Sequence, residues 1–189
     1  MVVPKFQMAT LEARCLDAFP NWLRSLADDA RALAGVLEAD APEAAQRRSA
    51  AALNYLFKSL DLIPDGLEDL GFIDDAFVVR AAAEGVKLDS EAALAADPTG
   101  SLARLAEEAE LVHEFLGDEY GRLTSYVAGL EQGSARGRTV AAILGDSGIR
   151  ADFVREVREW AEGYAIPSFT RDERNLVKLK SFLLAKLPA

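Results

Sequence analysis

The chain has 189 residues, a formal net charge of −10 at pH 7 and 50% hydrophobic residues. A chain of this length and apolar content can bury a substantial core, which argues against an intrinsically disordered protein. The negative charge opposes general attraction to nucleic acid and to anionic lipid surfaces.

The cysteine content and the N-terminus predict a cytoplasmic protein. Cys15 is the only cysteine, so an internal disulfide is excluded, and residues 1–19 contain no basic segment followed by an apolar run. No stretch approaches the roughly 18 uninterrupted apolar residues of a spanning helix, so we do not expect membrane insertion.

Two amphipathic helices are predicted in the first third of the chain. Apolar residues recur at three- and four-residue steps over residues 20–37. A second helix is expected to begin with Pro42 in its first turn and to continue through Leu60. Pro64 excludes the α conformation for the residue before it, so this helix should stop around residues 61–62.

A third helix is expected at the centre of the fold. It should begin near Phe72 and end at Glu84, with Gly85 as its C-terminal cap. The residues of this helix are apolar on nearly every side, which is typical of a buried helix. The four residues between Gly66 and Gly71 have the length of one short helical turn.

A short helix near Ser90 and a linker over residues 96–101 precede a long helical stripe over residues 102–130. Gly117 should split or bend this stripe, and Asp118 is placed to cap the second piece. The loop at 132–139 then leads to a short apolar helix that ends at Gly145.

Two further helices complete the chain. One is expected over residues 149–164, and Thr170 and Glu173 have the spacing of a capping box for a last helix that reaches residue 187. No alternating strand pattern competes with these helices. We therefore predict an all-α bundle of about seven to eight helices, with residues 1–97 and 98–189 packed together as one unit.

Six carboxylates lie in the most apolar part of the chain, in the segment YLFKSLDLIPDGLEDLGFIDDAFVV over residues 55–79. A carboxylate in an apolar setting must find a cation, backbone N–H groups or a metal ion, or else take up a proton. The central helical hairpin is therefore expected to be organised around this acidic turn. The six carboxylates are Asp61, Asp65, Glu68, Asp69, Asp74 and Asp75.

The first interpretation of the acidic turn is structural. Asp65 is placed to cap the short turn, and Asp74 or Asp75 to cap the third helix. Asp75 also falls on the apolar stripe of that helix, so it needs a dedicated partner, for which Lys58 and Arg80 are the nearby cations.

The second interpretation is a site for a hard cation, because clustered carboxylates without histidine or cysteine suit Mg²⁺, Mn²⁺ or Ca²⁺. Its ligands would be Asp61, Asp65, Asp74 and Asp75. The calcium-loop pattern itself does not fit, since Ile63 stands at the third ligand position and Phe72 replaces the terminal glutamate. The third interpretation is a partner-binding surface with exposed acids.

The same segment resembles a known family. Tyr55, the sequence D-L-I-P-D at 61–65, and Gly71 followed by Asp74 and Asp75 resemble the signature of the YkvA-like family, which comprises small helical bacterial domains of unknown function. The resemblance covers roughly residues 31–83. It implies a helical hairpin joined by the acidic turn, and it implies no reaction, substrate or cofactor.

Weaker signals favour structural roles. Glu110 and His113 form a Glu-x-x-His step, but a di-iron site needs a second step and His113 is the only histidine. Residues 136–139 precede a helix start without the phosphate-loop lysine. Cys15 has no base or resolving cysteine near it in sequence.

The leading functional hypothesis is a cytoplasmic, non-catalytic interaction or scaffold module that binds a protein partner and needs no cofactor. The alternative is a divalent-metal-dependent hydrolase of a phosphate ester, with the four aspartates above as ligands. The sequence therefore does not decide whether the protein is an enzyme. The residues assigned to the motif or to partner binding are Tyr55, Lys58, Asp61, Pro64, Asp65, Gly71, Asp74, Asp75 and Arg80.

Overall fold

The computed structural model describes residues 9–58, 61–95 and 97–189. The chain is 74% helical, which confirms the all-α fold. Leu60 of the expected second helix, Ala96 of the expected linker and residues 1–8 lie outside the described residues. The helices are α1 (Leu11–Glu38), α2 (Glu43–Tyr55), α3 (Ile73–Asp89), α4 (Glu91–Ala95), α5 (Ser101–Leu116), α6 (Tyr120–Gly129), α7 (Val140–Gly145), α8 (Ser147–Gly163) and α9 (Glu173–Lys186), with 3₁₀-helices η1 (Gly117–Glu119) and η2 (Leu130–Gln132).

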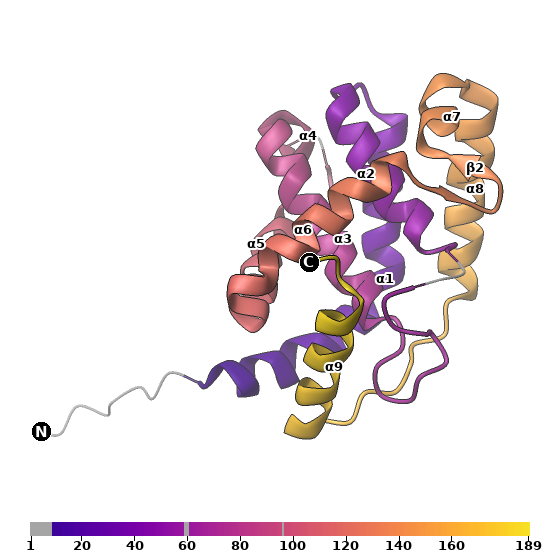
Figure 1. Ribbon diagram of the computed structural model, residues 1–189. Helices are drawn as coiled ribbons and strands as arrows, with labels where there is room; N and C mark the ends of the chain where they lie inside the picture. The colour runs from indigo at the N-terminus through magenta and orange to yellow at the C-terminus, as the bar shows by residue number, and fades with distance from the viewer. Residues whose placement is uncertain (1–8, 59–60, 96) are drawn as a thin grey trace, which may run out of the picture.

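Helix α3 lies at the centre, packed against α1, α2 and α5 (Figure 1). Its apolar side chains from Ile73 to Val86 are buried on every side, as expected for a central helix, whereas Leu88 in its last turn is exposed. It does not end at Gly85 but continues to Asp89. Gly85 instead makes room for α2, because a Cβ atom at this position would lie 2.8 Å from Cδ of Arg48.

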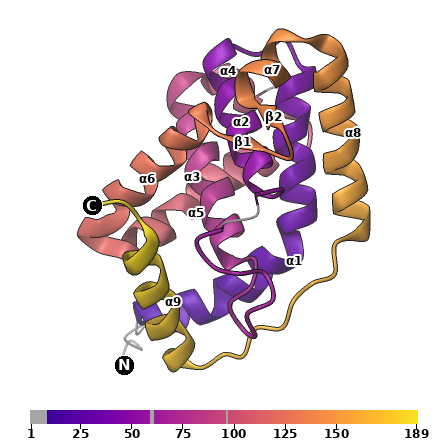
Figure 2. The same cartoon turned by 45° about the vertical axis from the view of Figure 1, so that its right-hand side comes forward.

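Helix α1 begins nine residues before the expected start at Pro20, and Thr10 caps it by accepting a hydrogen bond from the Ala13 amide at 3.2 Å. Pro20 therefore lies inside the helix, where it removes one hydrogen bond and produces a kink. Both views show α1 bent between its N-terminal part and the rest (Figures 1 and 2). The bend carries Phe19 and Trp22 into the core, with ring centroids 5.2 Å and 5.9 Å from that of Phe77.

The C-terminal half packs on the same core, with α5 against α3 and α8 against α1. Gly117 adopts a left-handed φ of 61° and separates α5 from α6, as predicted. Asp118 does not cap α6, which has no side-chain cap. The loop at 132–139 also contains a two-stranded antiparallel ladder, β1 (Ser134–Ala135) with β2 (Arg138–Thr139), that the sequence did not predict.

Helix α9 crosses the N-terminal part of α1 (Figure 2). Its cap is Asp172, which accepts from the Arg174 amide at 2.9 Å, so the capping box predicted at Thr170 is wrong. Phe182 on this helix is 37% exposed. Of the described helices, none combines the length and the apolar character that a membrane crossing requires.

Candidate site around the acidic turn

Helix α2 ends at Tyr55, earlier than the sequence predicted. The chain leaves the helix through tight turns, in which the Phe57 amide donates to the Asn54 carbonyl at 3.2 Å and the Lys58 amide to the Tyr55 carbonyl at 2.9 Å. Pro64 therefore does not set the helix end. Tyr55 becomes the last helical residue, with its side chain 1% exposed.

Tyr55 and Asp74 join the two arms of the hairpin. The Tyr55 hydroxyl donates to Asp74 Oδ2 at 2.6 Å and accepts from the Leu62 amide at 2.8 Å. The Ile63 amide donates to the same Asp74 oxygen at 2.9 Å. Two buried backbone N–H groups of the turn are thus satisfied by side chains from α2 and α3, which removes the cost of burying them unpaired.

The rest of the turn folds by backbone hydrogen bonds without forming the expected helical turn. The Leu67 carbonyl accepts from the amides of Leu70 at 3.2 Å and Gly71 at 2.8 Å. Gly71 is required by close contact, because a Cβ atom there would lie 2.0 Å from the Asp65 carbonyl oxygen. Phe72 precedes α3 in a left-handed conformation with φ of 63°, and no side chain caps α3.

Asp74 and Asp75 are both buried, with exposed fractions of 0% and 2%. Burial raises the pKa of Asp74 to about 6, although the hydrogen bonds from Tyr55 and Ile63 act in the opposite direction. Burial and the neighbouring Asp74 raise the pKa of Asp75 well above its ordinary value. Neither residue caps α3, so the capping role predicted for them is wrong. Asp74 reaches back to the turn instead.

Asp61 and Asp65 lie nearer the surface than Asp74. Asp61 is half-buried, and burial with repulsion from Asp65 and Asp74 raises the pKa of Asp61 to about 7. Asp65 is exposed, and partial burial of its carboxyl group raises the pKa of Asp65. Its side chain makes no capping hydrogen bond within the described ranges. Three buried oxygens accept no hydrogen bond from the described part of the chain: Asp61 Oδ1, Asp74 Oδ1 and Asp75 Oδ2.

Arg80 is fully buried and belongs to a separate ion network that joins α1, α3 and α5. Its guanidinium donates to Glu108 at 2.9 Å and lies 3.5 Å from Asp29 Oδ2. Arg104 forms a hydrogen-bonded ion pair with the other oxygen of Asp29. The Arg80 guanidinium also stacks over the ring of Trp22, with its central carbon 4.1 Å from the ring centroid. Burial lowers the pKa of Arg80 to about 10, despite the two carboxylates.

The expected pairing of Asp75 with Arg80 or Lys58 is therefore wrong for the described residues. Arg80 faces the other network, and Lys58 lies over the rings of Tyr55 and Tyr126, with Nζ at 5.9 Å and 5.3 Å from their centroids. Lys58 also donates to the Tyr126 hydroxyl at 3.3 Å. Because none of the cations in the described part of the chain pairs with it, Asp75 is best accommodated in the protonated form.

Comparison with known families matches the segment that holds this hydrogen-bond network. Residues 49–80 match a family described as a protein of unknown function (DUF1232). The match begins in α2 and ends at Arg80, so it contains Tyr55, the turn and Asp74. No curated protein and no solved structure matches the chain. The match supports a small domain of unknown function.

Within the part of the chain that the structure describes, no three or more His, Cys, Asp or Glu side chains are grouped as metal ligands. The four aspartates of the acidic turn lie close enough to influence one another's pKa, but they are not grouped as metal ligands. Glu110 and His113 are exposed on α5. Burial raises the pKa of the Cys15 thiol to about 12, which suits a core residue better than a nucleophile.

The sequence analysis missed the acceptors of Arg80, although a signal was present. Asp29 lies three residues after Leu26 and four before Leu33, on the apolar stripe of α1. This is the same spacing that singled out Asp75 on α3. The rule that a charged residue on a buried stripe needs a partner would have paired Asp29 with Arg80, the cation on the central helix.

Proposed function

We propose that the protein is a non-catalytic helical interaction module in which the DUF1232 segment presents residues 61–71 as a preformed surface. The observation that supports this most directly is the Tyr55–Asp74 hydrogen bond at 2.6 Å. Asp74 is fully buried and accepts a hydrogen bond from the Ile63 amide, so its role is to hold the backbone of the turn in one conformation. A turn already ordered in the free protein loses little conformational entropy when a partner binds.

The exposed part of the turn has the chemistry of a docking surface for a cationic partner. Pro64, Asp65, Gly66 and Glu68 are exposed, and Leu67 is half-buried among them. Two carboxylates around a rigid proline offer charge complementarity to lysine or arginine on a partner. The assignment to the YkvA-like family and a cytoplasmic location belong to the same proposal, supported by the motif residues and by the lone, buried cysteine.

The proposal is tested with a photo-crosslinking amino acid at Glu68, used in the cells that make the protein. A discrete protein adduct is expected at Glu68, and it should disappear when Asp65→Lys is added. The matched control carries the same crosslinker at Glu159, an exposed residue of α8. Circular dichroism verifies that each variant is folded. Equal adducts at both positions, or none at Glu68, would reject the turn as the docking surface.

The second candidate function is a metal-dependent hydrolase of a phosphate ester, with Asp61, Asp65, Asp74 and Asp75 holding Mg²⁺, Mn²⁺ or Ca²⁺. The specific observation that favours it is the set of three buried carboxylate oxygens without hydrogen-bond partners among the described residues. A divalent ion that drew these side chains together would satisfy the oxygens and neutralise their charge, although the described side chains are not grouped as metal ligands. The ion would supply an activated water for hydrolysis.

This candidate predicts that millimolar Mg²⁺, Mn²⁺ or Ca²⁺ raises the Tm above that measured in sodium chloride of equal ionic strength. Asp61→Asn should abolish the shift and any phosphatase turnover together. A Tm that follows ionic strength alone would remove this candidate and leave the interaction module. A shift accompanied by turnover would replace the interaction module with the enzyme.

A further inference from the structure

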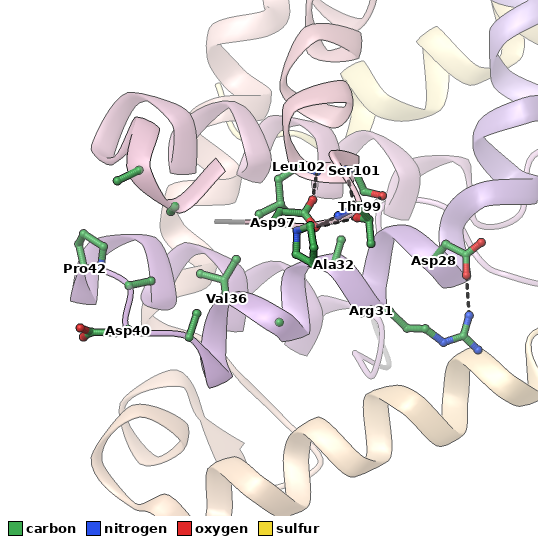
Figure 3. A pocket seen from close by; sticks show the side chains of 16 residues that line it. Asp28, Arg31, Ala32, Val36, Asp40, Pro42, Asp97, Thr99, Ser101 and Leu102 are labelled. Atoms are coloured by element: carbon green, nitrogen blue, oxygen red, sulfur yellow. Dashed lines mark hydrogen bonds and ion pairs between the residues drawn. The ribbon is translucent and has the colours of Figure 1, made fainter. Parts of the chain in front are cut away.

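A groove lies between the C-terminal half of α1 and the segment formed by α4 and the start of α5 (Figure 3). Its volume is about 490 Å³, within the range of sites that hold small organic molecules. The floor is apolar and made of small side chains, so it offers contact surface without hydrogen-bonding groups. The floor residues are Ala32, Gly35, Val36, Ala93 and Leu102.

Carboxylates surround this apolar floor. Asp28 and Asp40 lie toward opposite ends of the groove, and Asp97 lies above its middle (Figure 3). The rim also contains one cation, Arg31, which pairs with Asp28 at 2.7 Å. The groove therefore has a net charge of −2, and the protein around it is also anionic. This charge favours a cationic occupant.

Asp28 and Asp97 already have partners within the protein, whereas Asp40 has no ion-pair partner among the described residues. Asp97 accepts hydrogen bonds from the amides of Leu102 and Thr99, each at 2.9 Å. These bonds outweigh its partial burial and lower the pKa of Asp97. Asp40 is exposed and forms no ion pair with any described residue. It is available to a ligand without the loss of an internal contact.

The spacing of the terminal carboxylates indicates the length of the ligand. Asp28 and Asp40 are twelve positions apart along α1 and its C-terminal extension. The ten helical steps from Asp28 to Glu38, the last residue of α1, span about 15 Å, and the two residues that follow are not helical. The lining between Asp28 and Asp40 consists of the apolar floor, Arg31, Asp97 and the hydroxyl groups of Thr99 and Ser101. A matching molecule is elongated, carries positive charge at both ends and near its middle, and has methylene groups between the charges.

We infer that this groove binds a linear organic polycation of the polyamine class. The terminal ammonium groups lie on Asp28 and Asp40, an inner ammonium group faces Asp97, and the methylene chain lies along Ala32, Gly35 and Val36. A fatty acid of the same length would place its single carboxylate beside Asp28 or Asp40 and be repelled there. A compact divalent metal ion would leave the apolar floor unused.

Isothermal titration of the full chain with spermine tests the inference. The expected result is saturable binding of one spermine per chain that weakens as sodium chloride is added. Dodecylamine, with a charge at one end only, should bind at least about tenfold more weakly, since both the second terminal ion pair and the inner pair with Asp97 are lost. Dodecanoate should not bind. Preferential binding of dodecanoate or of dodecylamine would overturn the assignment.

Gly35→Leu tests the place of binding. A Cβ atom at Gly35 meets nothing within 4 Å, so the leucine side chain enters the groove without a clash, and leucine favours the helix over glycine. Gly121→Leu on α6 is the matched control, because Gly121 also has nothing within 4 Å of its Cβ position. Spermine binding should be lost in the first variant and kept in the second. Equal affinities in both would show nonspecific charge attraction and reject the site.

Asp40→Asn tests the contribution of the Asp40 charge to spermine binding. The affinity for spermine should fall about fivefold, as expected for one surface ion pair. Asp118→Asn removes the same charge from the exposed η1 segment and should leave the affinity unchanged. Equal losses in the two variants would mean that only the net charge of the protein matters, and this would also overturn the inference.

Discussion

The Tyr55 hydroxyl lies 2.6 Å from Asp74 Oδ2, and these two residues come from opposite arms of the central hairpin. The same hydroxyl accepts from the Leu62 amide, and the same carboxylate accepts from the Ile63 amide. Each side chain therefore forms one hydrogen bond with the other and one with a backbone N–H group of the turn. Because all four groups are buried, the loss of one leaves others without a partner.

Tyr55→Phe should destabilise the protein without changing its fold. The variant removes the donor to Asp74 and the acceptor of the Leu62 amide, and an unpaired buried group costs about 1–3 kcal/mol. The free energy of unfolding is measured with urea. Tyr164→Phe is the control, since its half-buried hydroxyl lies outside this network and donates to the Leu23 carbonyl at 3.0 Å. Equal losses in the two variants would contradict a special role for the Tyr55–Asp74 pair.

Gly71→Ala should destabilise the turn by steric overlap. The added methyl group would lie 2.0 Å from the Asp65 carbonyl oxygen, so the backbone of the turn must move. Forced shifts of this kind cost about 1–3 kcal/mol. Gly66→Ala in the same turn has nothing within 4 Å of its Cβ position and should have little effect. The urea midpoints of the two variants are compared. An unchanged midpoint for Gly71→Ala would show that the backbone of the turn can move without a cost in stability.

The sequence predicted the helices and the central acidic hairpin because these depend on local rules. Apolar spacing placed α3 at the centre, and Gly117 separated α5 from α6. Helix ends were less accurate where tertiary contacts decide them. Pro20 stays inside α1 because the kink brings aromatic rings into the core, and Gly85 stays inside α3 because Arg48 packs against it. Neither contact is visible in a local window of sequence.

In the acidic turn, too, local sequence predicted some features, whereas others depend on tertiary contacts. Burial of Asp75 followed from its position on the apolar stripe of α3, and the structure confirms it. Burial of Asp74, which was expected as a possible helix cap, did not follow from the sequence. Their partners did not follow, because side-chain direction depends on how α2 and α3 cross. Nearness along the chain suggested Arg80 as the cation for Asp75. The helix turns Arg80 toward Asp29 and Glu108, which come from distant segments.

Arg80→Met should be strongly destabilising, by about 3 kcal/mol, because Asp29 is left buried with Arg104 as its remaining cation. Adding Asp29→Leu to this variant should recover part of the loss, since a buried ion pair can be replaced by apolar side chains. The free energy of unfolding is measured for both variants and for Arg31→Met, whose exposed ion pair should contribute little. A double variant less stable than Arg80→Met would contradict this account.

Asp61→Asn should change how stability depends on pH. The pKa of Asp61 is about 7 in the folded protein against an ordinary value of 3.8, so between these values the folded state binds more protons than the unfolded state. Its contribution to the free energy of unfolding is therefore full below pH 4 and is lost as the pH rises to 7. Asparagine does not titrate. The stability of the variant relative to the native protein should rise over this window and then level off.

The control for this pH profile is Asp172→Asn, which should give a slope of opposite sign. The hydrogen bonds from Arg174 lower the pKa of Asp172 to about 2. Its contribution to stability is present above pH 4 and is lost as the pH falls toward 2, so this variant should be relatively most stable in acid. Urea unfolding at intervals of pH measures both profiles. If the difference in the free energy of unfolding between Asp61→Asn and the native protein does not change between pH 4 and pH 7, the Asp61 carboxyl group is ionised over the whole range. The turn would then hold a charge that is not expected for a carboxyl group buried to this extent.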